Sequence, residues 1–402
     1  MNNRFISTLL IIVFCISITN CTKEEKNIQS KPEQTNKIVI ERNNINHLKP
    51  KLNEILNSIS KENNNVGILA SIDIKDKYFW DGASGISEFD RGLQANSNMK
   101  FIIASNNKVF IAAIALKLVE EGKISLNDSI SKYIGEYKNL SGHITIKQLL
   151  NHTSGIFDYA KHPESVFQKG FDPELKPLEM KPQDILTNYL DEPYFEPGKG
   201  WHYSSTNYVL LSVIIEKITG YKMKELIEKF LLVPYKLSDT YVSSVFLIQN
   251  NNNILHGFYD IDNDGKREDW SKEELAHHIS PFVYCQMIST TRDLAKWTYK
   301  YCTGEVLSKE MTYEMTRFIK PVIGESWAQG YGLGIAYGHI GSHEWWGHAG
   351  NTFGYMSAMG YMPAYDFSFS IAINTNNESV ILSATAQLVM EVIKHLNQKL
   401  QE

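Results

Sequence analysis

Hydrophobic and polar positions follow two different periods along the chain. Residues 45–59 repeat apolar positions every three to four residues, which predicts a helix. Residues 66–85 hold two apolar runs, which predict two strands joined by a charged turn. In residues 105–297 the periodic segments are mostly helical, and glycine or proline stands at several of their ends. Short runs in 331–374 predict strands, and residues 379–400 predict a closing helix.

Strands near both ends of the chain, with helices between them, favour one mixed α+β fold that carries a mostly helical insertion. With 402 residues and 43% hydrophobic positions, the chain is globular and long enough to bury a sizeable core. We expect a sheet domain made of residues 45–105 and 298–402, and a mostly helical domain made of residues 106–297.

The first twenty residues have the pattern of an export signal. Arg4 gives a positive start, and the apolar run FISTLLIIVFCISI is short for a membrane span. The following ITNC resembles the lipobox of bacterial lipoproteins, which implies a signal peptide at 1–20 and a lipidated Cys21. Residues 21–44 are polar and aperiodic, as in a flexible tether. We therefore expect an exported, membrane-anchored lipoprotein at the periplasm or cell surface; the alternative is an ordinary secretory signal or uncleaved anchor in which Cys21 has no role.

Charge and cysteine content narrow the possible partners. The net charge of -5 is small and forms no long block of one sign, which argues against a nucleic-acid partner. Cys285 and Cys302 either form a disulfide or remain two buried thiols. The acidic run 260–269 resembles the start of a calcium loop, but Ser271 stands where the closing glutamate belongs, which favours a surface turn. We predict neither a metal nor a cofactor.

The most informative short stretch is FIIASNNKVFIAAIALKLVEEGK, where a buried apolar run turns into an amphipathic helix at Ser105 and Lys108. A serine hydroxyl needs a neighbouring base to become a nucleophile, and a lysine can be that base. Residues three apart share one helix face, so the two side chains are expected side by side near the positive end of the helix dipole. This arrangement suits acyl transfer. The alternative is a serine helix cap with the lysine reaching to solvent.

The spacing alone is weak evidence, because the chain repeats it in polar surroundings at Ser58/Lys61, Ser97/Lys100 and Ser129/Lys132. Further motifs favour Ser105. Together with SNNK at 105, the chain contains LLNHTSGI at 149, PGKGWHYSSTNYVLLSVIIEKITG at 197, STTRDLAKW at 289, YGLGI at 331 and GHAGNTFGY at 347. In this order they resemble the serine beta-lactamases and penicillin-binding D-alanyl-D-alanine peptidases, in particular the class C-like branch with its related esterases. The resemblance spans about 66–374.

The resemblance implies a beta-lactamase/transpeptidase-like fold, in which an antiparallel sheet is flanked by helices and carries an inserted, mostly helical domain. It also implies that Ser105 is the acylated nucleophile and that Lys108 takes or relays its proton. Tyr203 in YSS corresponds to the family tyrosine that moves protons to the leaving group and helps activate the deacylating water.

The sequence HAG corresponds to the third motif of the family. By this resemblance His348 holds a substrate carboxylate or orients the tyrosine, and Gly350 belongs to the same motif. The resemblance also implies an oxyanion hole formed by the backbone N–H groups of Ser105 and Asn351, the second of which lies on a strand edge.

Two positions depart from the family pattern. Ser205 replaces the usual asparagine two places after the tyrosine, and Ala349 replaces a serine or threonine whose hydroxyl often binds the substrate carboxylate. We expect a lipid-anchored serine hydrolase that acts through an acyl-enzyme on peptidoglycan-derived D-alanyl peptides or on small esters and amides, with beta-lactams less favoured. The alternative function is a catalytically inactive protein that binds cell-wall peptides or a partner on the same fold.

Overall fold

The computed structural model describes residues 47–75, 77–165, 181–242, 253–260, 265–271, 286–320, 322 and 327–398. They all belong to one compact unit, Lys37–Glu402. The predicted signal peptide, the tether with Cys21, and Cys285 lie outside the described residues. Within the described residues the first helix is α1 (Leu48–Glu62).

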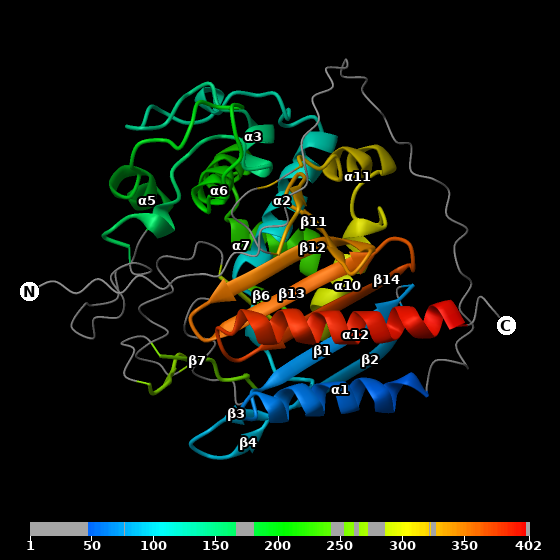
Figure 1. Ribbon diagram of the computed structural model, residues 1–402. Helices are drawn as coiled ribbons and strands as arrows, with labels where there is room; N and C mark the ends of the chain where they lie inside the picture. Colours follow the sequence, from blue (N-terminus) through cyan, green and yellow to red (C-terminus); the bar gives the residue numbers. More distant parts are fainter. Residues whose placement is uncertain are drawn as a thin grey trace, which may run out of the picture. The chain divides into compact units, whose positions relative to one another are not determined.

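The centre of this unit is a seven-stranded antiparallel sheet in the order β10-β11-β12-β13-β14-β1-β2 (Figure 1). The strands come from both parts of the chain that the hydrophobic pattern had marked. They are β1 (Ile68–Ile74), β2 (Lys77–Ser84), β10 (Gly330–Tyr331), β11 (Ala336–Ile340), β12 (His343–Thr352), β13 (Tyr355–Met362) and β14 (Phe367–Ile373). The first strand pairs with the last, from Ile68↔Ile373 to Ile74↔Phe367, which joins the two parts into one sheet.

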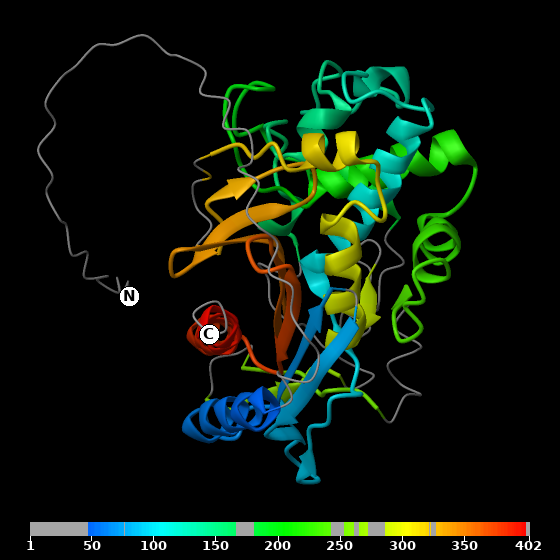
Figure 2. The ribbon, with the colours of Figure 1, turned by 90° about the vertical axis from the view of Figure 1, so that its right-hand side faces the viewer.

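The sheet separates two hydrophobic cores. On one face lie α1 and the closing helix α12 (Glu378–Gln398), and on the other lies α10 (Thr291–Cys302) (Figure 2). Side chains alternate along a strand, so Leu69 of β1 faces the core on the α10 side while Ile68 and Ala70 face α1 and α12. The predicted mixed fold with an antiparallel sheet flanked by helices is confirmed.

The helices between the two parts of the sheet pack around α2 (Asn107–Glu120). Every residue from Asn107 to Leu116 is buried, so the predicted amphipathic character of this helix is wrong: neighbours cover it on nearly all sides. Phe110 stacks on Trp297 of α10 with ring centroids 4.6 Å apart, which connects α2 to the helix under the sheet. The other elements of this region are η3 (Ile130–Lys132), α3 (Ile146–Leu150), η4 (Tyr159–Lys161), α5 (Pro182–Asn188), α6 (Thr206–Thr219), α7 (Met223–Ile227) with the π-turn Glu228–Leu232, and α11 (Lys309–Met315).

The described residues also form three small sheets. These are β3 (Ile86–Glu88) with β4 (Leu93–Gln94), β5 (Phe101–Ile102) with β9 (Met287–Ser289) and β6 (Tyr241–Val242), and β7 (Phe258–Tyr259) with β8 (Glu268–Asp269). The predicted domain boundary at residue 297 falls inside α10, whose contacts are mainly with β14, β1 and β13. This helix therefore belongs with the sheet.

Two features bear on the membrane and thiol predictions. Within the described residues, α12 is long and apolar enough to cross a membrane, but half of its apolar window is buried inside the protein, as in a core helix of a folded domain.

Cys302 is buried in the core on the α10 side, and this burial raises the pKa of its thiol.

Candidate active site

Ser105 lies in a single helical turn, η2 (Ala104–Asn106), between β5 and the start of α2. The turn is anchored to β9, because Ile103 donates its N–H to the carbonyl of Met287 at 3.0 Å. Ala104 has a φ of +48°, a left-handed conformation that disfavours a residue with a Cβ. The sharp turn sets Ser105 at the positive end of the buried helix.

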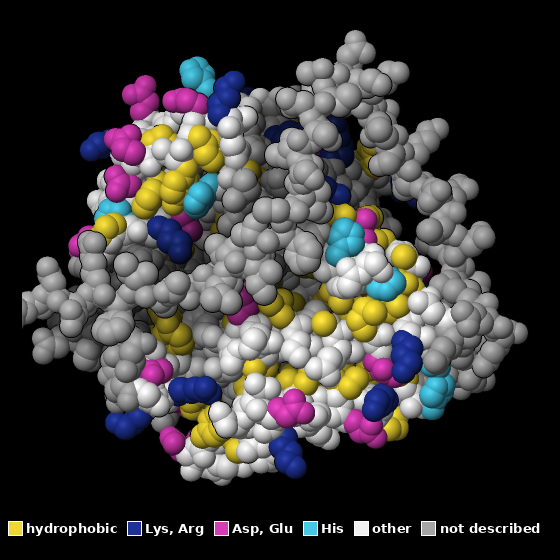
Figure 3. All heavy atoms as spheres, viewed as in Figure 1, with side chains coloured by type: hydrophobic (Ala, Val, Ile, Leu, Met, Phe, Trp, Pro, Cys, Tyr) yellow, Lys and Arg dark blue, Asp and Glu magenta, His cyan; other side chains and the backbone are white. Residues whose placement is uncertain are grey.

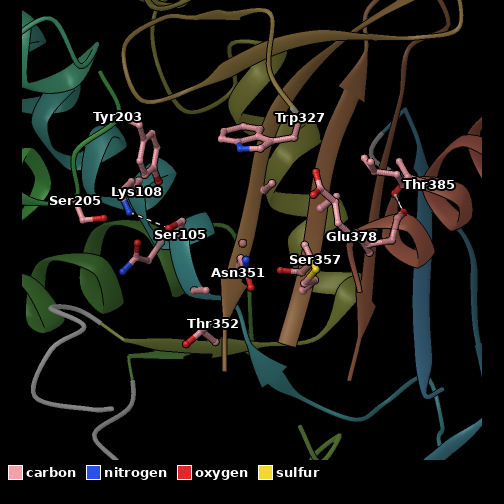
Figure 4. A pocket seen from close by; sticks show the side chains of 18 of the residues that line it. Ser105, Lys108, Tyr203, Ser205, Trp327, Asn351, Thr352, Ser357, Glu378 and Thr385 are labelled. Carbon is pink, nitrogen blue, oxygen red and sulfur yellow. Dashed lines mark hydrogen bonds between the residues drawn. The ribbon is translucent and has the colours of Figure 1, made fainter. Parts of the chain in front are cut away.

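Lys108 donates a hydrogen bond from Nζ to Ser105 Oγ at 3.0 Å (Figure 4). The lysine is only 5% exposed, and the serine is partly exposed to the cavity in front of it. The three other pairs of the same spacing are engaged elsewhere: Ser58 bonds Glu62, Lys100 pairs with Asp239, and Lys132 pairs with Asp128. The hydrogen bond between serine and lysine sets Ser105 and Lys108 apart; burial does not, because Lys100 is 7% exposed and thus also buried, contrary to the polar surroundings expected for it.

Tyr203 lies against the same lysine, in the loop before α6. Its ring centroid is 5.1 Å from Lys108 Nζ, and Figure 4 draws the three side chains together at one end of the cavity. The structure therefore brings together the three residues predicted to carry the chemistry. The ring of Trp327 faces them across the cavity, with its centroid 6.4 Å from that of Tyr203.

His152, which the sequence analysis left without a role, supports the tyrosine loop. It is fully buried, and its ring lies 4.4 Å from that of Tyr203. Its Nδ1 accepts hydrogen bonds from the backbone N–H of Ser204 at 3.2 Å and from Asn207 Nδ2 at 3.0 Å. Burial and the charge of Lys108 hold the pKa of His152 well below its ordinary value, so the ring is neutral. In the sequence, only its position in the motif LLNHTSGI could have pointed to a role for His152.

Asp158 is a second residue that sequence reasoning missed. It is buried beside Ser205, whose backbone N–H it accepts at 3.1 Å, and both residues line the cavity. Burial raises the pKa of the Asp158 carboxyl, partly offset by backbone hydrogen bonds and by Lys108. Ser205 lies where the prediction placed it, facing the cavity (Figure 4).

Among the described strands, β12 presents an unpaired edge to Ser105. Pairing with β11 ends at Ala336↔Gly347, whereas pairing with β13 continues to Thr352↔Tyr355 at a two-residue hairpin loop. Hydrogen-bonded and non-bonded pairs alternate along an antiparallel ladder, and such a loop closes on a bonded pair. The N–H of Asn351 therefore points away from β13, toward the free edge, as an oxyanion-hole donor requires.

Asn106 and Gly350 allow the turn η2 to pack closely against β12 and β13. Asn106 is fully buried, and its Nδ2 donates to the carbonyl of Ile103 at 3.1 Å and to Ser357 Oγ of β13 at 2.8 Å. A Cβ added at Gly350 would lie 2.3 Å from the Ile103 carbonyl oxygen and 2.8 Å from Asn106 Nδ2. Glycine is required here because the strand passes directly over the turn.

His348 does not line the cavity in front of Ser105, and its two predicted roles, holding a substrate carboxylate or orienting the tyrosine, stay predictions. It is fully buried; its Nδ1 donates to the carbonyl of Ala349 at 2.6 Å, and its Nε2 accepts from the Tyr331 hydroxyl at 2.9 Å. Burial and the charge of Lys108 lower the pKa of His348 to about 3, so it carries no charge at neutral pH. Its ring centroid lies 6.2 Å from that of Tyr203, which is compatible with orienting the tyrosine.

The cavity in front of Ser105 has a volume of about 1030 Å³. Ser105, Lys108, Tyr203, Ser205, Ala349, Gly350 and Asn351 all line it. The cavity therefore joins every predicted site residue of the folded part except His348. Of the residues the structure describes, no group of three His, Cys, Asp or Glu side chains is arranged to hold a metal ion.

Comparison with known proteins agrees with this geometry. The Beta-lactamase family model matches residues 52–392. Protein flp of Staphylococcus aureus (strain MRSA252) is 28% identical over 326 residues, which are 80% of this chain and 60% of that protein; this chain thus spans about 60% of the length of that relative. Penicillin-binding protein 4* of Bacillus subtilis (strain 168) is 33% identical over 158 residues, which are 39% of this chain and 34% of that protein.

Solved structures share the fold. A D-stereospecific amidohydrolase from Streptomyces sp. is 27% identical with a TM-score of 0.71, covering 83% of this chain and 97% of its own. The octameric penicillin-binding protein homologue from Pyrococcus abyssi is 25% identical with a TM-score of 0.70, covering 85% and 77%. With the motifs in their predicted order and the matched fold, this chain belongs to the serine beta-lactamase and penicillin-binding protein family of hydrolases.

Proposed function

We propose that this protein is a serine hydrolase that cleaves amides or esters through an acyl-enzyme on Ser105. The observation that carries the proposal is the 3.0 Å hydrogen bond between Ser105 Oγ and the buried Lys108 Nζ, beside Tyr203 in an open cavity. A nucleophile within hydrogen-bond reach of a base is the arrangement that activates a serine.

In the acylation step Lys108 acts as the neutral amine: Ser105 Oγ attacks the substrate carbonyl carbon while the serine proton passes to Lys108 Nζ. The oxyanion accepts hydrogen bonds from the N–H groups of Ser105 and Asn351. The bond to the leaving amine or alcohol then breaks, and the leaving group takes a proton through Tyr203. Water subsequently attacks the acyl-enzyme, gives a proton to the same groups, and releases a carboxylic acid and free Ser105.

Amides and esters without a carboxylate next to the scissile bond fit this site best. Ala349 has no hydroxyl for a substrate carboxylate, and His348 is buried and neutral. The similarity to an amidohydrolase described as D-stereospecific supports small amides, including D-aminoacyl amides, as the first substrates to examine. Penicillins and D-alanyl-D-alanine, which both carry that carboxylate, are less favoured.

The deciding experiment is reaction of the protein with a fluorophosphonate and, separately, with a labelled penicillin, followed by peptide mass spectrometry. We expect fluorophosphonate to label Ser105, and expect this label to be lost in Lys108→Ala. Ser129→Ala is the matched control, because Ser129 has the same spacing to Lys132 and should not affect labelling. Absence of any adduct in folded wild-type protein would instead support the binding-protein function.

We also propose that the protein is exported and anchored through a lipid on Cys21. The apolar run before ITNC and the polar stretch after it support this proposal. Cys21→Ser should move the protein from the membrane fraction to the soluble fraction, whereas Cys15→Ser should not. Equal fractionation of both variants with the wild type would contradict the lipid anchor.

A further inference from the structure

The cavity continues beyond Ser105, over the face of the sheet that α12 covers. We infer that this extension, here called the α12 groove, is a subsite for an uncharged apolar chain of the substrate. Its walls are Ala349, Met356, Ala358, Ile381, Leu382 and Thr385. The inference rests on the proposed function, because it assigns the groove to a chain attached to the carbonyl that Ser105 attacks.

The sheet wall of the groove is built from small side chains. Ala349 of β12 and Ala358 of β13 are directly opposite each other, and both are only half-buried. A cross-strand pair of larger residues would fill the space between sheet and helix. Met356, two residues along β13, points to the same face and adds an adaptable apolar surface. The short side chains are what keep the groove open.

The helix wall is apolar as well. Leu382 is 46% exposed although it lines the cavity, and Ile381 beside it is buried. The Thr385 hydroxyl donates to the Ile381 carbonyl at 2.7 Å, so its hydrogen-bonding need is met within the helix. In the space-filling view, hydrophobic side chains gather along α12 on the side of the sheet (Figure 3). A ligand chain in the groove would remove this apolar surface from water.

An acidic residue beside the groove favours substrate chains that carry no negative charge. Glu378, at the start of α12, lines the same cavity, and Figure 4 draws its carboxylate toward the space between Trp327 and Ser357. A negative group here disfavours a chain that ends in a carboxylate. An alkyl or aryl chain that is continuous with the scissile ester or amide satisfies both the apolar walls and this charge.

The test uses two ester series with the wild-type protein: p-nitrophenyl esters of acids from acetate to octanoate, and acetate esters of alcohols from methyl to octyl. We expect kcat/KM to rise at least tenfold along one of the series, since each fully buried methylene is worth about fourfold. The responding series shows whether the acyl chain or the leaving group occupies the groove. A flat profile in both series would overturn the subsite.

Variants locate the effect. Ala358→Leu, which fills the groove, and Leu382→Gln, which makes it polar, should abolish the preference for long chains, so that kcat/KM no longer rises from the shortest to the longest ester. Met390→Gln is the matched control, because Met390 is a 37% exposed apolar residue on the same helix that does not line the cavity. Glu378→Gln should improve only substrates whose chain ends in a carboxylate. Retained chain preference in Ala358→Leu and Leu382→Gln would place the chain elsewhere and contradict the proposal.

Fluorophosphonate labelling of Ser105 in each protein distinguishes failure of the subsite from failure of the proposed hydrolase function. Normal labelling with no dependence on chain length would mean that the groove is not a subsite while the proposed function stands. A wild-type protein that is not labelled and does not hydrolyse any ester would remove the proposed function itself, and the subsite with it.

Discussion

The side-chain amide of Asn106 helps to fix the relative position of the two proposed oxyanion donors. It follows the nucleophile directly and hydrogen-bonds to Ser357 on the strand paired with Gly350. The turn that carries Ser105 is thus tied by this side chain to β13, whose partner strand β12 carries Asn351, the second proposed oxyanion donor. Small errors in the position of such donors are costly, because the stabilisation depends on their preorganisation.

We therefore predict that Asn106→Ala lowers kcat about tenfold or more with little change in KM, measured by steady-state hydrolysis of a p-nitrophenyl ester. The reason is a loosened oxyanion hole, which acts in the transition state and not in substrate binding. Ser357→Ala should lower kcat similarly, and the double variant should be less than additive because both remove the same contact.

The control for this prediction is Asn374→Ala. Asn374 is equally buried and makes two comparable bonds, accepting from Gly67 N–H at 2.7 Å and donating to the Ile86 carbonyl at 2.9 Å, but it does not line the cavity. It should lower the melting temperature and leave kcat unchanged. Equal effects of both substitutions on kcat would refute a positioning role for Asn106.

At this scale the sequence identified three side chains that the structure brings together, and it missed the residues that hold them in place. Ser105, Lys108 and Tyr203 were found because a local motif fixes each type of residue. His152, Asp158 and Asn106 act through contacts with Ser204, Ser205 and Ser357, which lie far along the chain. No local pattern encodes such contacts, so these residues needed the folded structure.

Among the elements, β12 is held in position beside η2 by several close contacts. Gly350 permits its approach to η2, and the Asn376 side chain holds the hairpin end by donating to Asn351 Oδ1 at 2.5 Å and to the Thr352 carbonyl at 2.7 Å. The strand is thus fixed at both ends of the segment that faces the nucleophile.

Gly350→Ala should reduce fluorophosphonate labelling of Ser105 about a hundredfold, because the new methyl group must displace either the strand or the nucleophile turn. The labelling rate and the circular dichroism spectrum are measured together, so that loss of fold is recognised. Gly135→Ala is the control, since a Cβ there meets nothing within 4 Å. Normal labelling in Gly350→Ala would show that the close contact is not essential.

Element prediction succeeded where the periodic pattern was long, as in α1, α6 and α12. It failed for β5, β9 and β6, which have two or three residues each and exist only because they pair with one another across the chain. The prediction of an amphipathic α2 failed because two of its polar residues are buried. The polar Asn107 and Lys108 are buried there by the site they serve, so polarity did not indicate exposure.

For the whole molecule, buried neutral histidines make stability depend on pH. The pKa of His348 is about 3 when folded, whereas an unfolded histidine titrates at about 6.5. Between these values the unfolded chain binds more protons, so this contribution to stability is complete above about pH 6.5 and is lost as the pH falls toward 3. His152 acts in the same direction, and Asp158, whose pKa is raised, acts in the opposite direction.

We predict that from pH 7 to pH 5 the unfolding free energy of the wild type falls by about 2 kcal/mol more than that of His348→Gln, measured by urea unfolding at both values. The comparison cancels the contributions of His152 and Asp158, which both proteins retain. Asn374→Ala is the matched control, because it removes a buried side chain that carries no titratable group. Identical pH dependence in the wild type and His348→Gln would mean that the pKa of His348 is the same in the folded and unfolded states.

The pairing of β1 with β14 has a consequence for how the protein is made. Contacts between the first and last strands of a sheet form late, because a long loop must close before they are rewarded. Until residue 373 has left the ribosome, the middle of the sheet is missing and β12 has no settled place beside η2. The nascent chain therefore lacks the candidate active site until β14 has been made, and a fragment shortened before β14 would lose the sheet's interior and not merely its edge.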